Sequence, residues 1–171
     1  MSKIFKSANL DMTPNHSPFS QFSWSASPRL EKMAQSKYLH FEMKSLNPRR
    51  FSYPYHFHRN AEELFVIMEG EATLRSPEGF QQVAKGDILF FEEGPAGAHQ
   101  LYNHGSSPCL YLDIRTEANV DVCEYPDSGK INILPTIEVF QAASKIPYYS
   151  GEENVRDHWP EDLMSLTDER S

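Results

Sequence analysis

Apolar and polar side chains alternate along much of the middle of the chain. Between residues 37 and 46, and again between 109 and 115, large apolar residues occupy every second position. A period of two indicates a β-strand whose two faces lie in different surroundings. Turn-forming residues separate such runs, and no helical period interrupts them. The predicted strands cover residues 37–46, 51–58, 63–69, 71–75, 80–83, 88–91, 98–102 and 109–115.

A series of strands without helices indicates an all-β protein, and closure into a small barrel or jelly roll removes the exposed edges of the sheet. We expect one barrel at 38–116, since no internal repeat is visible. An irregular N-terminal arm at 1–37 carries aromatic residues without a clear period and is either mobile or docked on a neighbour. A C-terminal extension at 117–171 is expected to pack partly on the barrel, with a short helix or strand within 135–144 and a charged, peripheral end.

One stretch, from His56 to Gly70, combines strand patterns with residues that bind metals. His56 and His58 are two positions apart, so on a strand their imidazoles share one face. Glu63 opens an apolar run that ends at Gly70 and reads as the next strand. If the chain folds back between these strands, the carboxylate of Glu63 lies beside the imidazoles.

A third histidine, His99, occupies another short strand that ends in the turn-prone segment 103–108. Three imidazoles and one carboxylate form a nitrogen and oxygen set that suits a divalent first-row metal. The sequence therefore predicts one metal ion, from the group Fe, Mn, Ni, Zn and Cu.

These residues resemble the cupin superfamily, and in particular its small single-domain bacterial members of the conserved-barrel type. The first cupin motif is Gly, five residues, His-x-His, three or four residues, Glu, six residues, Gly; here the two histidines, Glu63 and Gly70 match it, and Arg50 stands where the first glycine is usual. The second motif, Gly, five residues, Pro-x-Gly, two residues, His, three residues, Asn, is matched less closely. Its counterparts here are Gly86, Pro95, Gly97, His99 and Asn103, with eight residues instead of five between Gly86 and Pro95.

The resemblance covers residues 38 to 115 and implies a double-stranded β-helix, which is the cupin jelly-roll barrel. It also implies a homodimer, since single-barrel cupins usually pair. The arm at residues 19–24 or the strand at Leu39 is the expected contact with the second subunit. Carried over residue by residue, the resemblance names the metal ligands as His56, His58, Glu63 and His99.

Glu62 is an alternative to Glu63, because the first motif tolerates three or four residues before its glutamate. Strand parity and the six-residue spacing to Gly70 favour Glu63, which leaves Glu62 as a solvated or supporting carboxylate. The other histidines are interpreted as surface or strand residues rather than ligands, namely His16, His40, His104 and His158.

Composition narrows the classes of partner. The chain has 171 residues with 24 acidic and 16 basic side chains, a formal charge of −8, which disfavours nucleic acid and anionic membranes as partners. There is no apolar run long enough to span a membrane and no secretory signal pattern, so we expect a soluble, cytoplasmic protein. Cys109 and Cys123 lie in strand-like runs and are expected to be reduced, buried thiols.

Strand parity also predicts the wall of a pocket beside the metal. Phe65 and Ile67 share the face of the carboxylate ligand, and Leu101 and Asn103 share the face of the third histidine. This wall is largely apolar and favours a small organic ligand over a phosphorylated sugar. A sugar phosphate would need a cation from elsewhere, for instance Arg49, Arg50, Arg59 or Lys85.

The favoured function is therefore a metal-dependent enzyme that acts on a small organic molecule, of the dioxygenase, decarboxylase or isomerase kind. A non-catalytic barrel that binds a metal or small molecule stays open, as does a sugar-phosphate isomerase, because the fold does not decide between them. No catalytic acid or base is identified by spacing. The candidates are Glu62, Glu69, Tyr102 and Tyr111.

Overall fold

The computed structural model describes residues 2–15 and 17–164, so His16 and residues 165–171 of the predicted C-terminal extension lie outside the described part. The chain divides into two units, one ending at Gln141 and the other beginning at Ala142. The second unit contains three short helices, η3 (Ala142–Ser144), η4 (Val155–His158) and α2 (Glu161–Met164). No helix in the described part of the chain is long and apolar enough to cross a membrane.

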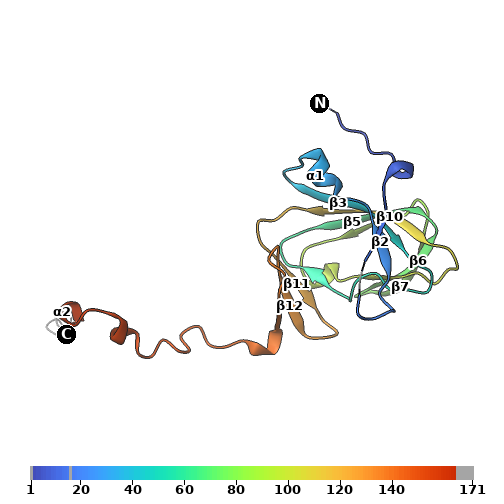
Figure 1. Cartoon of the computed structure of the whole chain (residues 1–171). Coiled ribbons are helices and arrows are strands. Elements are labelled where there is room, and N and C mark those ends of the chain that lie inside the picture. The colour runs from blue at the N-terminus through green and yellow to red at the C-terminus, as the bar shows by residue number, and fades with distance from the viewer. Residues whose placement is uncertain (1, 16, 165–171) are drawn as a thin grey trace. The chain divides into compact units, whose positions relative to one another are not determined.

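The first unit is built almost entirely of antiparallel strands, which confirms the predicted all-β jelly-roll class (Figure 1). They form a six-stranded sheet in the order β1-β2-β3-β10-β5-β8, a four-stranded sheet β13-β12-β11-β4 and a three-stranded sheet β7-β6-β9. The 3-10 helix η1 (Ser7–Asn9) precedes the first strand, while the 3-10 helix η2 (Pro95–Gly97) and the helix α1 (Leu30–Ala34) lie between strands. The strands are β1 (Thr13–Pro14), β2 (Trp24–Ala26), β3 (Leu39–Leu46), β4 (Phe57–His58), β5 (Glu63–Glu69), β6 (Glu71–Ser76), β7 (Gly79–Ala84), β8 (Ile88–Phe91), β9 (Gln100–Tyr102), β10 (Cys109–Thr116), β11 (Asp121–Tyr125), β12 (Lys130–Leu134) and β13 (Glu138–Gln141).

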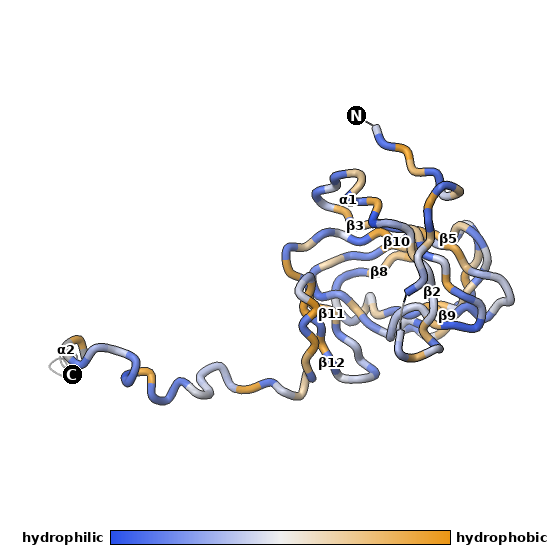
Figure 2. Tube along the Cα trace, in the orientation of Figure 1, coloured by the Kyte–Doolittle hydropathy of each residue, from blue (hydrophilic) through white to orange (hydrophobic). Residues whose placement is uncertain are grey.

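The inner face of the large sheet changes from polar to apolar along its central strands β3, β10 and β5. The side chains of β3 and β10 that face the interior are charged or polar near one end of the barrel, although their alternation is the one expected of a strand. At the other end, aliphatic and aromatic side chains form the packed core, with Leu46, Ile67 and Leu101 almost fully buried. Figure 2 shows both hydrophilic and hydrophobic residues within this group of strands. The polar half of the interior is where a site can form.

The outer face of the same sheet is apolar. Met68 of β5 and Ile88 and Phe90 of β8 are 42%, 67% and 58% exposed. Near β3 this face is partly covered by the chain's own N-terminal segment, where the ring of Phe5 lies 6.2 Å from that of Phe41. The apolar residues whose alternation predicted these strands therefore lie largely on the outside of the barrel.

One predicted strand, 51–58, is mostly irregular. Only Phe57–His58 forms a strand, β4, and His56 reaches the sheet through an isolated bridge to His99. Pro54 lies within the run and has no N–H to donate to a strand partner, which favours bends there. The expected alternation of faces fails as a result, so that Tyr53 lies on the side of the histidines.

Segments outside the predicted strands also join the sheets. The arm contributes β2, which pairs with β3, and Trp24 packs against the core of its own chain. In the predicted C-terminal extension, β11 pairs with β4 and brings Cys123 opposite His58. Residues 135–144, where either a short helix or a strand was expected, contain both the strand β13 and the 3-10 helix η3.

Two glycines allow close approaches that shape the barrel. Gly70 joins β5 to β6 with φ +79°, and a Cβ at this position would lie 2.6 Å from the carbonyl oxygen of Pro108. A Cβ at Gly97 would lie 1.9 Å from the carbonyl oxygen of Glu92. Only glycine permits this close packing of η2 on the end of β8, which sets the path of the chain into His99.

Candidate metal centre and cavity

Four buried side chains from separate elements meet at the polar end of the barrel. His56 and His58 come from the β4 region, Glu63 begins β5, and His99 lies between η2 and β9. Donor atoms of His56, His58 and Glu63 all lie within 4.8 Å of one another. One carboxylate oxygen, Oε2 of Glu63, is 3.4 Å from Nε2 of His58 and 3.1 Å from Nε2 of His99. The structure thus brings the four expected ligands together. The alternative Glu62 is exposed on the surface.

Hydrogen bonds orient all three imidazoles in the same way. Nδ1 of His56 donates to the carbonyl of Pro54 at 2.9 Å, and Nδ1 of His99 donates to the carbonyl of Gly97 at 2.9 Å. Nδ1 of His58 is bound to the carboxylate of Asp121. A carbonyl only accepts, so His56 and His99 each carry a proton on Nδ1, which leaves Nε2 as the atom of each ring that could bind an ion.

The geometry fits a bound cation. Oε2 of Glu63 and Nε2 of His99 are buried and lack a hydrogen-bond partner among the described residues. Two acceptors that face each other without a proton between them repel, and a divalent ion held between them removes this cost. Three imidazoles and one carboxylate are also donors that such ions accept.

Burial and neighbouring groups shift the pKa values of three of these four side chains. Burial and the neighbouring His99 lower the pKa of His56 to about 3, so this ring is neutral. Burial alone would raise the pKa of Glu63, but the imidazoles of His58 and His99 outweigh it and hold that pKa well below its usual value. Burial acts against a charge on His58 as well, yet its contacts with Asp121, Cys123 and Glu63 raise its pKa to about 11.

Strand β11 supplies two further groups that the sequence did not reveal. Besides binding His58, Asp121 accepts hydrogen bonds at Oδ1 from the backbone N–H groups of Asn60 (3.1 Å) and Val122 (2.8 Å). Sγ of Cys123 lies 3.3 Å from Nδ1 of His58. Asp121 and Cys123 are two positions apart and share a strand face, but no local signal shows that this face meets the histidines.

A cavity of about 260 Å³ opens from the candidate metal-binding residues, and most of the residues that line it are polar or charged. Lys44 and Asp113 form a buried ion pair there, with Nζ of Lys44 2.5 Å from Oδ2 of Asp113 and 3.4 Å from Oε1 of Glu42. The ammonium group also lies 4.4 Å from the ring centre of Tyr53. The cavity is lined by Arg29, His40, Glu42, Lys44, Tyr53, His56, His58, Glu63, Asp113, Arg115, Cys123, Tyr125, Asn132 and Leu134.

Burial and charge act in opposite directions on the ion pair. Burial would lower the pKa of Lys44, but Asp113 outweighs it, so that the pKa is well above its usual value and the ammonium stays charged. Burial, together with the nearby charge of Glu63, raises the pKa of Asp113 to about 6 in spite of Lys44. Oδ1 of Asp113 has no hydrogen-bond partner among the described residues.

Comparison with known proteins agrees with this architecture. The cupin domain family matches residues 43–115. The chain contains a cupin-type barrel. The match ends at Arg115, so Asp121 and Cys123 lie outside it.

Several solved structures share the cupin fold of this chain. A candidate sugar phosphate isomerase from Acidithiobacillus ferrooxidans ATCC 23270 is 20% identical with a TM-score of 0.74, covering 84% of this chain and 95% of that chain. A sugar phosphate isomerase from Silicibacter pomeroyi DSS-3 is 17% identical with a TM-score of 0.73, covering 86% and 98%. A polyketide cyclase from Streptomyces resistomycificus is 18% identical with a TM-score of 0.56, covering 68% and 80%. No protein with a curated description matches the sequence.

The predicted apolar pocket residues lie elsewhere in the cupin barrel. Phe65 packs edge-on against His99, with 5.3 Å between ring centres, while Ile67 and Leu101 belong to the packed core. The side-chain amide of Asn103 donates to the carbonyls of Leu46 (2.9 Å) and Ser107 (2.8 Å), which fixes a turn. The cavity beside the histidines opens towards β3 and β11. Phe65, Ile67, Leu101 and Asn103 lie in the opposite half of the interior, so they do not form the wall that was expected of them.

None of the four acid or base candidates from the sequence lines this cavity. Glu62 and Glu69 are exposed, and Tyr102 stacks on Phe51 with 4.7 Å between ring centres. Tyr111 is fully buried opposite Lys44, and burial raises its pKa well above the usual value. The groups that do line the cavity, Lys44 and Asp113 among them, were missed because the apolar face of their strands was taken as the informative one.

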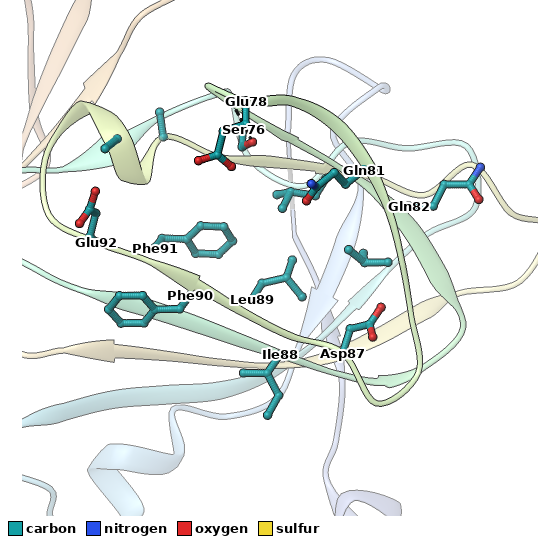
Figure 3. A pocket seen from close by; sticks show the side chains of 14 residues that line it. Ser76, Glu78, Gln81, Gln82, Asp87, Ile88, Leu89, Phe90, Phe91 and Glu92 are labelled. Atoms are coloured by element: carbon teal, nitrogen blue, oxygen red, sulfur yellow. Dashed lines mark hydrogen bonds between the residues drawn. The ribbon is translucent and has the colours of Figure 1, made fainter.

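A larger cavity of about 500 Å³ lies between β7, β8 and η2 (Figure 3). Figure 3 shows Gln81, Gln82 and Glu78 on one side of it and Phe91 on the other. The ring of Phe91 stacks on His99 with 3.7 Å between centres and separates this cavity from the metal-binding residues. It is therefore a distinct feature of the barrel.

Proposed function

We propose that this cupin is a metal-dependent enzyme that acts on a small, polar organic molecule by proton transfer, as an isomerase does. The observation that carries the proposal is the convergence of three Nε2 atoms and the Glu63 carboxylate at one end of a cavity that also holds Lys44 and Asp113. When bound, a divalent ion held by His56, His58, Glu63 and His99 supplies a Lewis acid for a substrate oxygen.

The protein's own contribution to such a reaction comes from the buried ion pair. Asp113 lines the cavity and has a free Oδ1, the atom that accepts a proton from a substrate carbon and returns it to the neighbouring carbon. Lys44 holds the other oxygen in place and keeps a positive charge beside the proton acceptor. No oxidant is needed, because the proton leaves and re-enters the same molecule.

Two arguments favour an isomerase over the dioxygenase and decarboxylase kinds. The cavity is lined mostly by charged and polar residues and carries an acid–base pair, which suits hydroxylated or carbonyl-bearing molecules. Two of the proteins with the same fold are named sugar phosphate isomerases, which agrees with this reading, although similarity at 17–20% identity concerns the fold.

Metal binding is tested by elemental analysis of protein purified without added metal. We expect about one equivalent in the wild type and in His104→Ala, and strong loss in His58→Ala, because three remaining ligands cannot complete the shell. His104 is a suitable control because it bonds to Thr73, away from the centre. Equal loss in both variants, or none in either, contradicts the metal site.

Proton transfer is tested with the metal-loaded protein in D₂O. Hydroxyaldehydes and hydroxyketones, with and without a phosphate group, are incubated and followed by NMR for deuterium entering at carbon. We expect exchange with at least one of them, and its loss in Asp113→Asn with metal content retained. If the metal binds but no exchange exceeds that in buffer, the protein is a non-catalytic binding barrel.

We also propose a homodimer that covers the outer face of the large sheet. The exposed apolar side chains there, Met68, Ile88 and Phe90, lie on adjacent strands, since β5 pairs with β8. A contiguous apolar patch on a sheet is costly in water and suits a second copy related by two-fold symmetry.

A further inference from the structure

Arg115 stands beside the metal-binding residues without being one of them. It lies on β10, directly opposite Glu63 on β5 and His40 on β3. It borders the cavity that opens from the histidines. The two-residue period of the strand puts it on the same face as Asp113.

The guanidinium of Arg115 forms no close ion pair with a described residue. Three other arginines do form ion pairs, with Arg29 3.1 Å from Glu31, Arg59 2.6 Å from Glu124 and Arg75 2.6 Å from Asp127. In residues 2–15 and 17–164, no carboxylate lies within 4.0 Å of the Arg115 guanidinium, although the side chain is half-buried. A half-buried, unpaired guanidinium is ready to bind an anion.

A second cavity, of about 180 Å³, lies on the other side of Arg115. It shares Arg29, Arg115 and Leu134 with the first cavity, so both guanidiniums belong to the wall between the two. Pro135 and Ile137 add an apolar but solvent-exposed rim.

The acidic groups at this second cavity are hydrogen-bonded to other groups or exposed to solvent. Asp121 borders it, but its oxygens are engaged with His58 and with two backbone N–H groups. Glu117 also borders it and is exposed to solvent, which screens its charge. Arg29 is partly neutralised by Glu31, which leaves Arg115 as the stronger of the two binding groups.

We propose that the second cavity is the subsite for an oxyanion group of the substrate, a phosphate ester or a carboxylate, held by Arg115 with help from Arg29. This inference rests on the proposed function and adds the substrate class: a small molecule whose reactive oxygens face the histidines and whose anionic end lies between the two arginines. The planar fork of Arg115 suits paired hydrogen bonds to such a group. From the sequence, the candidate cations were Arg49, Arg50, Arg59 and Lys85, whereas in the structure Arg115 borders the cavity.

The test is calorimetric titration of the metal-loaded protein with inorganic phosphate and, separately, with acetate. Arg115→Gln should weaken binding of the preferred anion by tenfold or more, while Arg59→Gln, which removes an exposed arginine that borders neither cavity, should leave it unchanged. Tighter binding of phosphate identifies a phosphate ester as the substrate group, and tighter binding of acetate identifies a carboxylate. Absence of binding to the wild type, or equal weakening in both variants, overturns the proposal.

A second variant and a second readout separate this proposal from the one on which it rests. Arg115→Lys keeps the charge, so it should fold where the glutamine variant does not, and it should bind several-fold more weakly because the paired contacts are lost. Affinity equal to that of the wild type in Arg115→Lys also overturns the role of the guanidinium. Metal content and deuterium exchange are measured in the same samples: Arg115-dependent anion binding by protein that takes up no metal, or that catalyses no exchange, refutes the enzyme proposal and leaves the anion subsite standing.

Discussion

The ammonium group of Lys44 lies 2.5 Å from the carboxylate of Asp113, and both side chains are buried inside the barrel. They belong to the adjacent strands β3 and β10 and lie one inward-facing position apart, since Lys44 is opposite Tyr111 and Asp113 is opposite Glu42. Burying two charges costs desolvation free energy, which two apolar residues of similar volume would not require. The position of the pair beside the candidate metal ligands suggests that it is retained for function.

Removing one partner of this pair should be strongly destabilising. Lys44→Met leaves the carboxylate of Asp113 buried without a counter-charge, and we expect a loss of about 3–5 kcal/mol in the free energy of unfolding. The double variant Lys44→Met/Asp113→Leu should recover most of this loss. Urea denaturation of the metal-loaded proteins measures both values, and losses that simply add in the double variant contradict the interpretation.

Asp121 should act on the metal through the orientation of His58. Asp121→Asn weakens the hydrogen bond that holds this ring and fixes its tautomer, so we expect metal affinity to fall by about 10- to 100-fold. Asp127→Asn is the control, because Asp127 is exposed and pairs only with Arg75 among the described residues. Competition with a chelator gives the affinities, and an equal change in both variants counts against a specific role of Asp121.

Much of the fold could be predicted because strand periodicity and the motif residues are local in sequence. His56, His58 and Glu63 lie within eight positions, so spacing and parity were enough to place them together. The alternation along β3 and β10 did not show which face turns inward. An apolar face normally marks the core, but here polar side chains such as Lys44 and Asp113 line a site, and the apolar face lies largely outside.

The remaining site residues depend on pairing between distant strands. Asp121 meets His58 across 63 positions of sequence, and Arg115 meets Glu63 through the register of β10 and β5. Neither register follows from a single sequence, since periodicity gives the faces of a strand but not its neighbours. These residues became visible only when the sheets were known.

Phe65 should behave as a core residue rather than a ligand-binding one. Its ring packs between Phe91 and Tyr111, with centres 5.1 and 5.0 Å away, and the side chain is 3% exposed. Phe65→Ala should therefore lower the free energy of unfolding by about 3–5 kcal/mol. Denaturation curves measure the change, and a variant with unchanged stability but weaker ligand binding would restore the pocket role predicted from the sequence.

The thiol of Cys109 should be unreactive under mildly alkaline conditions. Burial, with a smaller effect of Glu71, raises its pKa from 9.0 to about 11, so the folded chain holds the proton where the unfolded chain has lost it. Its contribution to stability is present below pH 9 and is lost as the pH rises towards 11. In a Cys123→Ser background, labelling at pH 8 to 10 should be at least about tenfold slower in the folded protein than in denaturant, since the thiolate is the reactive form. Equal rates would show that Cys109 is accessible and ionised normally.

The apolar outer face of the large sheet should hold two copies of the chain together. Ile88 and Phe90 point outward from β8, an edge strand of that sheet, and are the most exposed apolar side chains of this face. Replacing both with lysine places two like charges on each copy at a self-complementary interface, so the dimer should dissociate while the barrel stays folded. Phe80→Lys is the matched control, because Phe80 is 75% exposed but lies on β7, in a different sheet. Light scattering at micromolar concentration should show a dimer for the wild type and the control and a monomer for Ile88→Lys/Phe90→Lys. A wild-type monomer, or a dimer that survives both lysines, would mean that this face is not where the copies meet.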